Sequence, residues 1–337
     1  MGTTPRASVN QQIQIGVEAP SGTPAAANRL LDAFTWTLGL KPTTKQFRGT
    51  GRQYPSASAL LTEMSAGKIA GPGDFVQLVY PLSSLWGAAA IAAHGASATA
   101  HDWVWTPPIV GSYAANAKTF TVQAGDAIDA EQYAYLAFTG FGYSFSRKQD
   151  ITISGDLISQ TFTDGITLTA APTVVEQLPM TGAQFNIYLD PTSANIGTTQ
   201  LTDPLKVDFK ASGYYDGYWP INRSNASYTS LIDKEKKHEL KITLQANSVG
   251  IAVKGNYLET GDRCYVRIDG MGPVIDGANA INAAMQHDMA CFVTSMAEFS
   301  DVDGVYAIEY TLAIAEDAAW GAGEAQKMTL TNLLSAL

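Results

Sequence analysis

The sequence has few charged residues, few cysteines and no long hydrophobic run. Charged residues make up 15% of the 337 residues, compared with about 25% in an average soluble protein. Small polar residues must then cover much of the surface, and the centres of subunit interfaces are depleted in charge in the same way. This low charge is a first indication that the chain forms oligomers.

Basic residues are outnumbered by acidic ones, 21 to 31, which gives a net charge of −10. A protein that grips nucleic acid needs a basic stripe to neutralise the phosphates. The densest basic run, Lys234–Lys237, is interrupted by Glu235. The charge balance therefore argues against a protein that reads DNA sequence.

The two cysteines, Cys264 and Cys291, lie in stretches with the pattern of strands and belong to no framework of spaced cysteines. We expect two buried free thiols in a reducing compartment. The first residues, Met1–Arg6, lack the apolar core of a signal peptide. The most apolar stretch, Leu85–Ala93, is far shorter than the roughly 18 residues of a membrane span. We expect a soluble protein, made in the cytoplasm, with no membrane contact.

Side chains that could support catalysis are scarce. The four histidines are His94, His101, His238 and His287. The pair His101–Asp102 is accompanied by no nucleophile motif, and the helical spacing before Gly95 places His94 in the last turn of a helix. The run Asp301–Gly304 lacks the later acidic ligands of a calcium loop and predicts a tight hairpin turn. We expect no enzyme activity, no cofactor and no metal.

Internal repetition is the clearest organisational signal. The stretch 12–18 resembles 184–190 at an offset of 172, and the stretch 34–38 resembles 205–209 at an offset of 171. All four alternate apolar and polar residues, as half-buried strands do. The first half of the chain therefore matches the second in its opening elements.

Later elements keep the same order while the offset drifts. The stretch 75–80 predicts a strand that matches 239–244 at an offset of 164. Apolar residues at helical spacing follow each of these strands, over 82–93 and over 249–257. The order of strand and helix is thus the same in both halves.

Each half closes with a long predicted hairpin. The stretches 134–146 and 150–159 form the first, and 289–300 and 305–315 form the second, with a shared Phe-Ser dipeptide at an offset of 154. These strands approach the upper limit of length in globular proteins, and their edges carry few protecting charges. We expect such edges to pair with another chain.

The predicted fold is mainly β, with two tandem, duplicated antiparallel β-sandwich or barrel domains that each carry one packed helix. We expect an N-terminal arm over 1–11, a first domain over 12–170 and a second domain over 171–337. The boundary follows a change of composition at Ala170-Ala171-Pro172.

Four sets of short motifs, taken in order, are distinctive. They are RLLD, QFRGTG and YP over 29–55, AEQYAY over 130–135, ISGDL and DGITL over 153–168, and EFSDVDGVYAIEY over 298–310. In this order the sequence resembles the major tail protein, or tail tube protein, of long-tailed, non-contractile (siphovirus-type) bacteriophages. The likeness extends over most of the chain, and none of the motifs is a catalytic signature.

The resemblance implies a structural virion protein of tail-tube type whose long hairpins pair edge to edge in a ring. Stacked rings would form the tail tube, the conduit for genome ejection into the host. Tail tubes are usually sixfold, so a duplicated chain implies trimeric, pseudo-hexameric rings, with hexameric rings as the alternative. The implied partners are further copies of the chain, the tape measure and tail terminator proteins, and double-stranded DNA that passes through without specific binding.

Three sets of residues are candidates for this function. The acids expected to face the lumen, where negative potential would keep DNA off the wall, are Asp150, Asp156 and Glu309. The candidate inter-subunit hairpin residues are Tyr143, Phe145, Ile151, Ile153, Val305, Ala307, Ile308 and Tyr310. The candidate ring-to-ring contact loops contain Tyr54, Tyr215, Tyr218 and Trp219.

Aromatic residues support one alternative of a different class. Trp86, Trp103, Trp105 and the run 214–219 could form a platform for sugars in a tandem β-sandwich phage protein that binds a receptor or carbohydrate. The alternation of Trp103 and Trp105 is also that of a strand, and aromatic residues are enriched at protein interfaces. We therefore favour assembly over carbohydrate binding.

Overall fold

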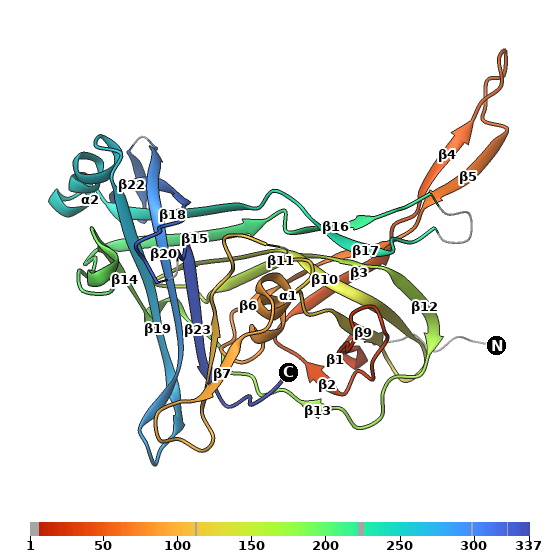
Figure 1. Ribbon diagram of the computed structural model, residues 1–337, viewed down its shortest axis with the longest axis horizontal. Helices are drawn as coiled ribbons and strands as arrows, with labels where there is room; N and C mark the ends of the chain where they lie inside the picture. The colour runs from red at the N-terminus through yellow and green to blue at the C-terminus, as the bar shows by residue number, and fades with distance from the viewer. Residues whose placement is uncertain (1–6, 112, 222–225, 298, 322) are drawn as a thin grey trace.

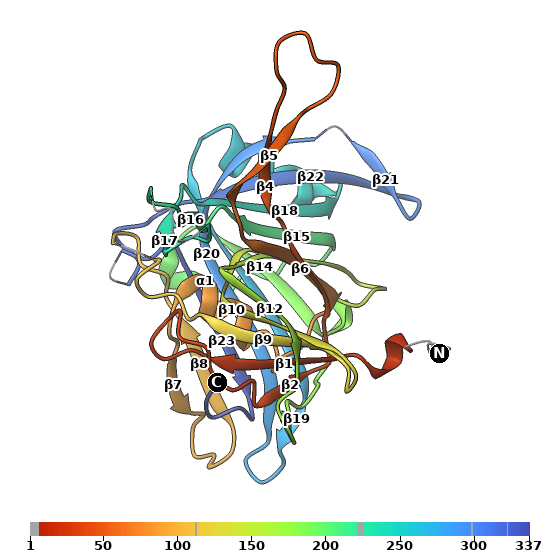
Figure 2. The same cartoon turned by 90° about the vertical axis from the view of Figure 1, so that its right-hand side faces the viewer.

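A computed structural model describes residues 7–111, 113–221, 226–297, 299–321 and 323–337 (Figures 1 and 2). Residues 1–6 of the expected arm and Glu298 of the fourth motif lie outside the described residues. The protein is mainly β, with 53% of residues in strands and 9% in helices, as the sequence predicts.

The first half begins with a single 3-10 turn at Ser8–Asn10. Its strands and α-helix are β1 (Gln12–Val17), β2 (Arg29–Leu31), β3 (Thr35–Leu40), β4 (Thr43–Phe47), β5 (Ala57–Thr62), β6 (Ser65–Pro72), α1 (Val79–Trp86), β7 (Ala90–Ala93), β8 (His101–Trp105), β9 (Phe120–Gly125), β10 (Ala130–Ser146), β11 (Thr152–Ser159) and β12 (Thr161–Ile166).

The second half has 3-10 turns at Gly182–Gln184 and Ser193–Asn195, and a π-helical turn at Lys254–Leu258. Its other elements are β13 (Thr173–Val174), β14 (Phe185–Asp190), β15 (Pro204–Ser212), β16 (Tyr215–Tyr218), β17 (Ser230–Asp233), β18 (Lys237–Gln245), α2 (Ser248–Val253), β19 (Arg263–Asp276), β20 (Ile281–Met296), β21 (Ser300–Val302), β22 (Val305–Ile314) and β23 (Gln326–Asn332).

The two halves have the same order of antiparallel neighbours. In the first half the order is β1-β9-β10-β11-β6-β3. In the second it is β14-β19-β20-β22-β18-β15. A β-bulge interrupts both long hairpins at one equivalent place, between Phe138 and Gly140 in β10 and between Val293 and Ser295 in β20. The bulges are 155 residues apart (293 − 138), which agrees closely with the hairpin offset in the sequence.

Residues of the two edge strands also correspond. The two bulges give a common starting point, from which the residue paired in each next strand can be compared between the halves. On this comparison Lys68 of β6 corresponds to Lys241 of β18, and Thr37 of β3 corresponds to Asp208 of β15. The second match has an offset of 171 (208 − 37). The sequence stretches 34–38 and 205–209 resemble each other at this same offset.

One strand prediction is wrong. The stretch 75–80 forms a turn and the start of α1, and the strand that matches β18 is β6, which lies earlier in the chain. Small residues make up most of β6, so its alternation is hidden in the sequence. The Asp74 carboxylate accepts hydrogen bonds from the amides of Val76 and Gln77, and this fixes a turn where the alternation predicts a strand.

The first helix is also displaced from its predicted position. It covers Val79–Trp86 and ends at Gly87, whose φ of 87° favours glycine. Residues 90–93 form β7, so His94 follows a strand and does not lie at a helix end. The second helix agrees better with its prediction, and Asn247 caps it by accepting hydrogen bonds from the amides of Val249 and Gly250.

The hydrophobic core is continuous through both halves. Every residue of α1 is buried, and this helix lies near the centre of the molecule, whereas α2 lies at one end (Figure 1). Cys264 and Cys291 are opposite each other in β19 and β20 and are buried free thiols, as predicted. The predicted hairpin turn is confirmed too, with Asp303 and Gly304 at φ values of 54° and 79° between β21 and β22.

Candidate assembly surface

Strand β10 joins the two halves into one sheet. Its first residues pair with β9, and its last residues pair with β11 on one side and with β15 on the other. A continuous antiparallel sheet results, with the order β3-β6-β11-β10-β15-β18-β22-β20. It has eight strands, four from each half.

One face of this eight-stranded sheet is polar and the other is packed on the core. A single row across the polar face contains Thr35, Ala70, Ser154, Gly142, Lys210, Glu239, Ala313 and Phe292. The core face is apolar in every strand, for example at Ile153, Phe209 and Leu240, which are all fully buried. This alternation gives the sheet one solvent-exposed face and one buried face.

Charges on the polar face are close to balanced. Its lysines are Lys68, Lys206, Lys210, Lys237 and Lys241, and its acids are Asp156, Asp208, Glu239 and Glu309. Ion pairs join neighbours at 3.5 to 3.8 Å, including Lys68 with Asp156 and Lys241 with both Glu239 and Glu309. The acid excess of the whole chain is therefore not concentrated on this face.

The acids expected to line a lumen have different positions. Asp156 and Glu309 both lie on the polar face, in β11 and β22. Asp150 is exposed and precedes β11, where it forms an isolated bridge with Thr181. Two of the three candidates thus share a surface, and both have lysine partners there.

Each end of the eight-stranded sheet has an open edge. Among the described residues, β3 pairs only with β6. At the other end, the residues of β20 after Phe292, and the whole of β21, pair only with β22 within the described part of the chain. Hydrophobic side chains accompany these edges: Leu40 is 42% exposed and Phe299 is 48% exposed.

Where β10 meets β15, no edge is open. Residues 140–146 of β10 pair with 206–212 of β15 in unbroken register, with Tyr143 opposite Phe209 and Phe145 opposite Val207. All four of these side chains are almost fully buried. The first hairpin is therefore paired within the chain, contrary to the expectation that another chain covers it.

A chain of buried polar groups lies next to this junction and connects the two halves. The Tyr143 hydroxyl is 2.8 Å from His287 Nδ1, and His287 Nε2 is 3.3 Å from the Gln326 amide oxygen. The Gln326 amide nitrogen is 3.4 Å from His238 Nε2. Burial lowers the pKa of His287 to about 3 and that of His238 to about 4, so both imidazoles are neutral at pH 7.

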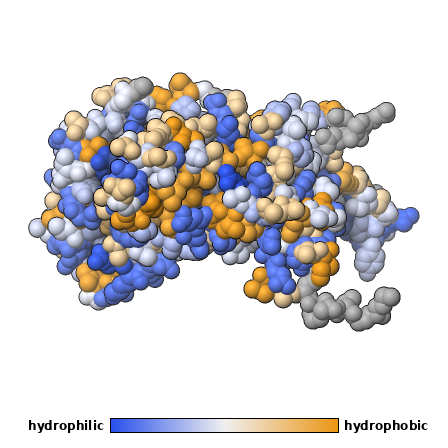
Figure 3. All heavy atoms as spheres, turned by 90° about the horizontal axis from the view of Figure 1, so that it is seen from below, coloured by the Kyte–Doolittle hydropathy of each residue, from blue (hydrophilic) through white to orange (hydrophobic). Residues whose placement is uncertain are grey.

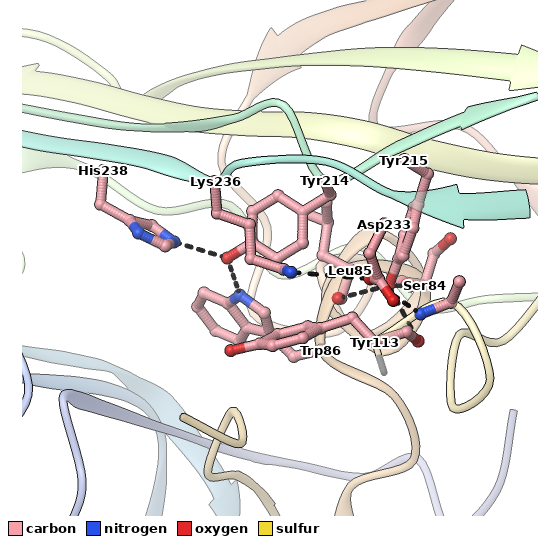
Figure 4. Close-up of polar contacts among 10 residues, drawn as sticks. Ser84, Leu85, Trp86, Tyr113, Tyr214, Tyr215, Asp233, Lys236 and His238 are labelled. Atoms are coloured by element: carbon pink, nitrogen blue, oxygen red, sulfur yellow. Dashed lines mark hydrogen bonds and ion pairs between the residues drawn. The ribbon is translucent and has the colours of Figure 1, made fainter. Parts of the chain in front are cut away.

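The polar chain continues to the first helix (Figure 4). Trp86 Nε1 donates to the Tyr214 hydroxyl at 2.7 Å, and that hydroxyl is 2.6 Å from His238 Nε2. The Tyr215 hydroxyl donates to the backbone carbonyls of Ser84 and Leu85. These bonds fix α1 of the first half against β16, the preceding residue Tyr214 and β18 of the second half.

A cation completes the same contact. The Lys236 ammonium lies 3.9 Å from the centre of the Tyr113 ring and 3.5 Å from the Asp233 carboxylate, which also accepts the Ala114 amide hydrogen (Figure 4). Together with the hydrogen bonds of Trp86, Tyr214 and Tyr215, the Lys236 contacts make the junction between the two halves both polar and densely packed.

The candidate hairpin residues are mostly interior. Those with at most 7% exposure are Tyr143, Phe145, Ile151, Ile153, Ala307, Ile308 and Tyr310, and only Val305 is more exposed. Apart from Ala307, which is buried on the face of Glu309, the side chains of these buried residues face the core of their own chain. Any contact that these strands make with another chain must therefore use backbone groups at the open edges.

The candidate contact loops are divided between two hairpins. Tyr54 belongs to the β4–β5 hairpin, which projects far from the body in both views, and it is 78% exposed (Figures 1 and 2). In the β16–β17 region, Tyr218 is 50% exposed, but Tyr215 is buried against α1 and Trp219 packs on Tyr228. Only the first hairpin is free to reach beyond the molecule.

Chemistry-bearing groups do not converge on a reaction site in the described part of the chain. The structure brings His94 to Asp102, at 2.8 Å, and the Thr331 hydroxyl donates to the same carboxylate. In acyl transfer the imidazole lies between nucleophile and carboxylate, whereas here the carboxylate is in the middle. No group of three metal-ligating side chains was found among the described residues, and none of their helices has the length and apolarity of a membrane span.

Comparison with known proteins identifies no family for this chain. No protein-family model matches the sequence, and no curated protein matches it. Among solved structures, the chain is similar to the SPP1 tail tube, determined by solid-state NMR and cryo-EM, at 14% sequence identity and a TM-score of 0.30. The match covers 44% of this chain and 78% of the SPP1 chain. A TM-score this low does not demonstrate a common fold, so the likeness supports no inference about this protein.

Proposed function

We propose that this protein is a structural virion subunit that assembles into closed rings, and that the rings stack into a phage tail tube for genome ejection. The observation that carries the proposal is the eight-stranded sheet, with one polar face, one core face and an open edge at each end. An open edge presents unpaired backbone groups that pair readily with another strand. Closing the sheet with further copies removes both edges.

The width of the sheet fits a conduit. Three copies of an eight-stranded sheet would give a barrel of 24 strands. With strands about 4.8 Å apart and tilted by about 40°, such a barrel would be about 45–50 Å across between backbones. That leaves an open channel inside the side chains, wide enough for a DNA duplex. Three copies would supply six halves with one strand order, a pseudo-hexameric ring; six copies remain the alternative.

The polar face is the surface that would line this channel. Lysines alternate with acids there, so no basic stripe exists to hold the phosphates of DNA. Asp156→Lys with Glu309→Lys would create such a stripe at two exposed positions. We expect normal tubes from this double variant but slower DNA release from virions. Unchanged release would show that these acids have no part in keeping DNA off the wall.

Stacking of rings would use surface that a single chain leaves apolar. Figure 3 shows hydrophobic residues gathered in patches across the middle of one face. On the β4–β5 hairpin, Phe47, Tyr54, Leu60 and Leu61 are each about half exposed or more. We propose that this hairpin contacts the next ring. The tape measure and tail terminator proteins would be further partners.

Electron microscopy of the purified protein is the direct test. Rings or tubes with threefold or pseudo-sixfold symmetry support the proposal. Discrete monomers at high concentration, with affinity for a glycan, would support the receptor- or carbohydrate-binding alternative. The burial of Trp86, Trp103, Trp105 and Tyr214 favours assembly, because a sugar platform needs exposed rings.

A further inference from the structure

We infer that β3 of one copy pairs antiparallel with the outer edge of β20 and β21 of the next copy, in the register that β15 and β10 use inside the chain. This inference rests on the proposed function and adds to it the identity of the two edges and the residues that face each other. Its basis is the duplication, because β3 is the counterpart of β15 and β20–β21 is the counterpart of β10.

The junction inside the chain provides the template. There Tyr143 is opposite Phe209, and Ser144 is opposite Asp208. The first pair is buried on the core face, and the second pair lies on the polar face. Side chains on both sides of the sheet thus define one register.

Two offsets transfer this template to the open edges. Thr152 of β11 corresponds to Ala307 of β22 at the offset of 155 found at the bulges; Ser144 pairs with the first and Ser300 with the second, so Ser300 is the counterpart of Ser144 at an offset of 156. Strand β15 follows β3 at an offset of 171. Applying these offsets places Ser300 opposite Thr37 of the next copy (144 + 156 and 208 − 171). They also place Phe299 opposite Leu38.

The strand directions agree with this pairing. Eight antiparallel strands alternate in direction, so the first and last strands of the sheet run opposite ways. A copy placed beside β20 by continuing the sheet therefore presents β3 antiparallel to it, as β15 is antiparallel to β10.

Exposed apolar surface lies at the same places. Phe299 stacks on Tyr306, with ring centres 4.9 Å apart, and the two side chains are 48% and 62% exposed. On the other edge Leu40 is 42% exposed and Leu38 is only partly buried. The corresponding residues of the junction inside the chain, Tyr143 and Phe209, are at most 1% exposed. Pairing between copies would bury Phe299 and Tyr306 against the apolar side chains of β3, as the junction inside the chain buries its own apolar pairs.

A cysteine pair tests the register directly. Thr37→Cys with Ser300→Cys changes two exposed residues, and the native cysteines are buried. Opposed residues in an antiparallel pair have Cα atoms about 4.5–5.5 Å apart, within disulfide range. We expect oxidation of the assembled double variant to link most chains to one another, with a covalent trimer as the largest species if rings contain three copies.

Two matched variants control the result. Thr35→Cys with Ser300→Cys keeps the same face but shifts the pair by two residues, about 7 Å, which is beyond disulfide reach. Ser144→Cys with Asp208→Cys makes the corresponding pair inside one chain and should close without linking chains. Rings that form without the Thr37–Ser300 link, or that link equally through position 35, would overturn the register and leave the proposed function standing.

Hydrogen exchange of the unaltered protein tests the same pairing even if the cysteine variants do not fold. Alternate amides of β3 point away from β6 and should exchange freely with deuterated water when the chain is unassembled. In assemblies they should be strongly protected. Assemblies without this protection contradict the inference, whereas the absence of any assembly overturns both the inference and the proposed function.

Discussion

Strands β3 and β15 occupy the same position in the two halves, but only β15 has a neighbour on both sides. Strand β15 pairs with β18 and β10, and its core residues Val207 and Phe209 are at most 1% exposed. Strand β3 pairs with β6 alone among the described residues, and Trp36 and Leu38 are only partly buried. The difference shows that an edge strand of this fold is complete only when a counterpart of β10 lies beside it.

The largest expected effect is the difference in stability between truncating a core residue of β15 and truncating its counterpart in β3. Phe209→Ala should lower the free energy of unfolding of the unassembled chain by about 3–5 kcal/mol, because a fully buried ring is lost. Its counterpart Leu38→Ala should cost about 1 kcal/mol, because that side chain is partly exposed. Urea denaturation of both variants at low protein concentration measures the two costs. Equal costs would mean that β3 is already covered in the single chain.

Acid should weaken the second half more than the first. His238 of β18 has Ser65 as its counterpart in β6, at the offset of 173 that separates Lys68 from Lys241. The pKa values of His238 and His287, about 4 and 3, lie below the 6.5 of an exposed histidine because both are buried. The unfolded chain therefore takes up protons first as the pH falls, and stability is lost from about pH 6.5 downward, by up to about 1.4 kcal/mol per pH unit for each histidine.

Comparing variants isolates this effect. Burial raises the pKa of Asp74 to about 6, above its usual 3.8, so this group has the opposite sign and loses stability as the pH rises from about 4 to 6. The slope of stability against pH should therefore be compared between the native chain and His287→Gln. We expect the variant to be less stable at pH 7 but flatter below pH 6.5. His101→Gln, outside this buried group, serves as the control for the loss of a histidine.

The β16–β17 and β4–β5 hairpins should respond differently to loss of a tyrosine. Tyr215→Phe removes the hydroxyl that donates to the Ser84 and Leu85 carbonyls and should cost about 1–2 kcal/mol. Tyr54→Phe, on the exposed β4–β5 hairpin, should leave the melting temperature of the unassembled chain unchanged. Calorimetry measures the melting temperature of both variants. If Tyr54→Phe melted as low as Tyr215→Phe, the assignment of Tyr54 to an exposed hairpin would be wrong.

The smallest effects belong to the paired lysines of the polar face. Lys68 and Asp156 are 78% and 56% exposed, so Lys68→Ala should change stability by less than about 0.5 kcal/mol. Its counterpart Lys241 is 37% exposed and lies near two acids, so Lys241→Ala should cost slightly more. Raising the salt concentration should remove the difference; a difference that persists in high salt would point to packing of the Lys241 stem instead.

Much of the fold could be predicted from the sequence because alternation survives wherever strands are half buried. The stretches 12–18, 34–38 and 205–209 all form strands close to their predicted bounds. Strand β6 could not be predicted, since its small residues carry no apolar pattern. The domain boundaries at 11 and 170 remain predictions, and the pairing of β10 with β15 shows that the two halves share a sheet across the boundary at 170.

The candidate surface was harder to predict. Alternation shows that Tyr143 and Phe145 face one side of a strand, but it does not show which chain provides the neighbouring strand. That neighbour is β15, more than 60 residues later, and its identity depends on long-range pairing. The buried group of His238, His287 and Gln326 has no signature either, because its members are scattered over β18, β20 and β23.

The junction between β10 and β15 also bears on how assembly depends on concentration. Its two strands belong to one molecule, so they meet at a local concentration set by the tether, and dilution does not separate them. In a ring of three chains, every second joint would be of this kind. Dilution could then act on only three joints out of six, and a dissociating ring would release whole chains with their inner joints intact.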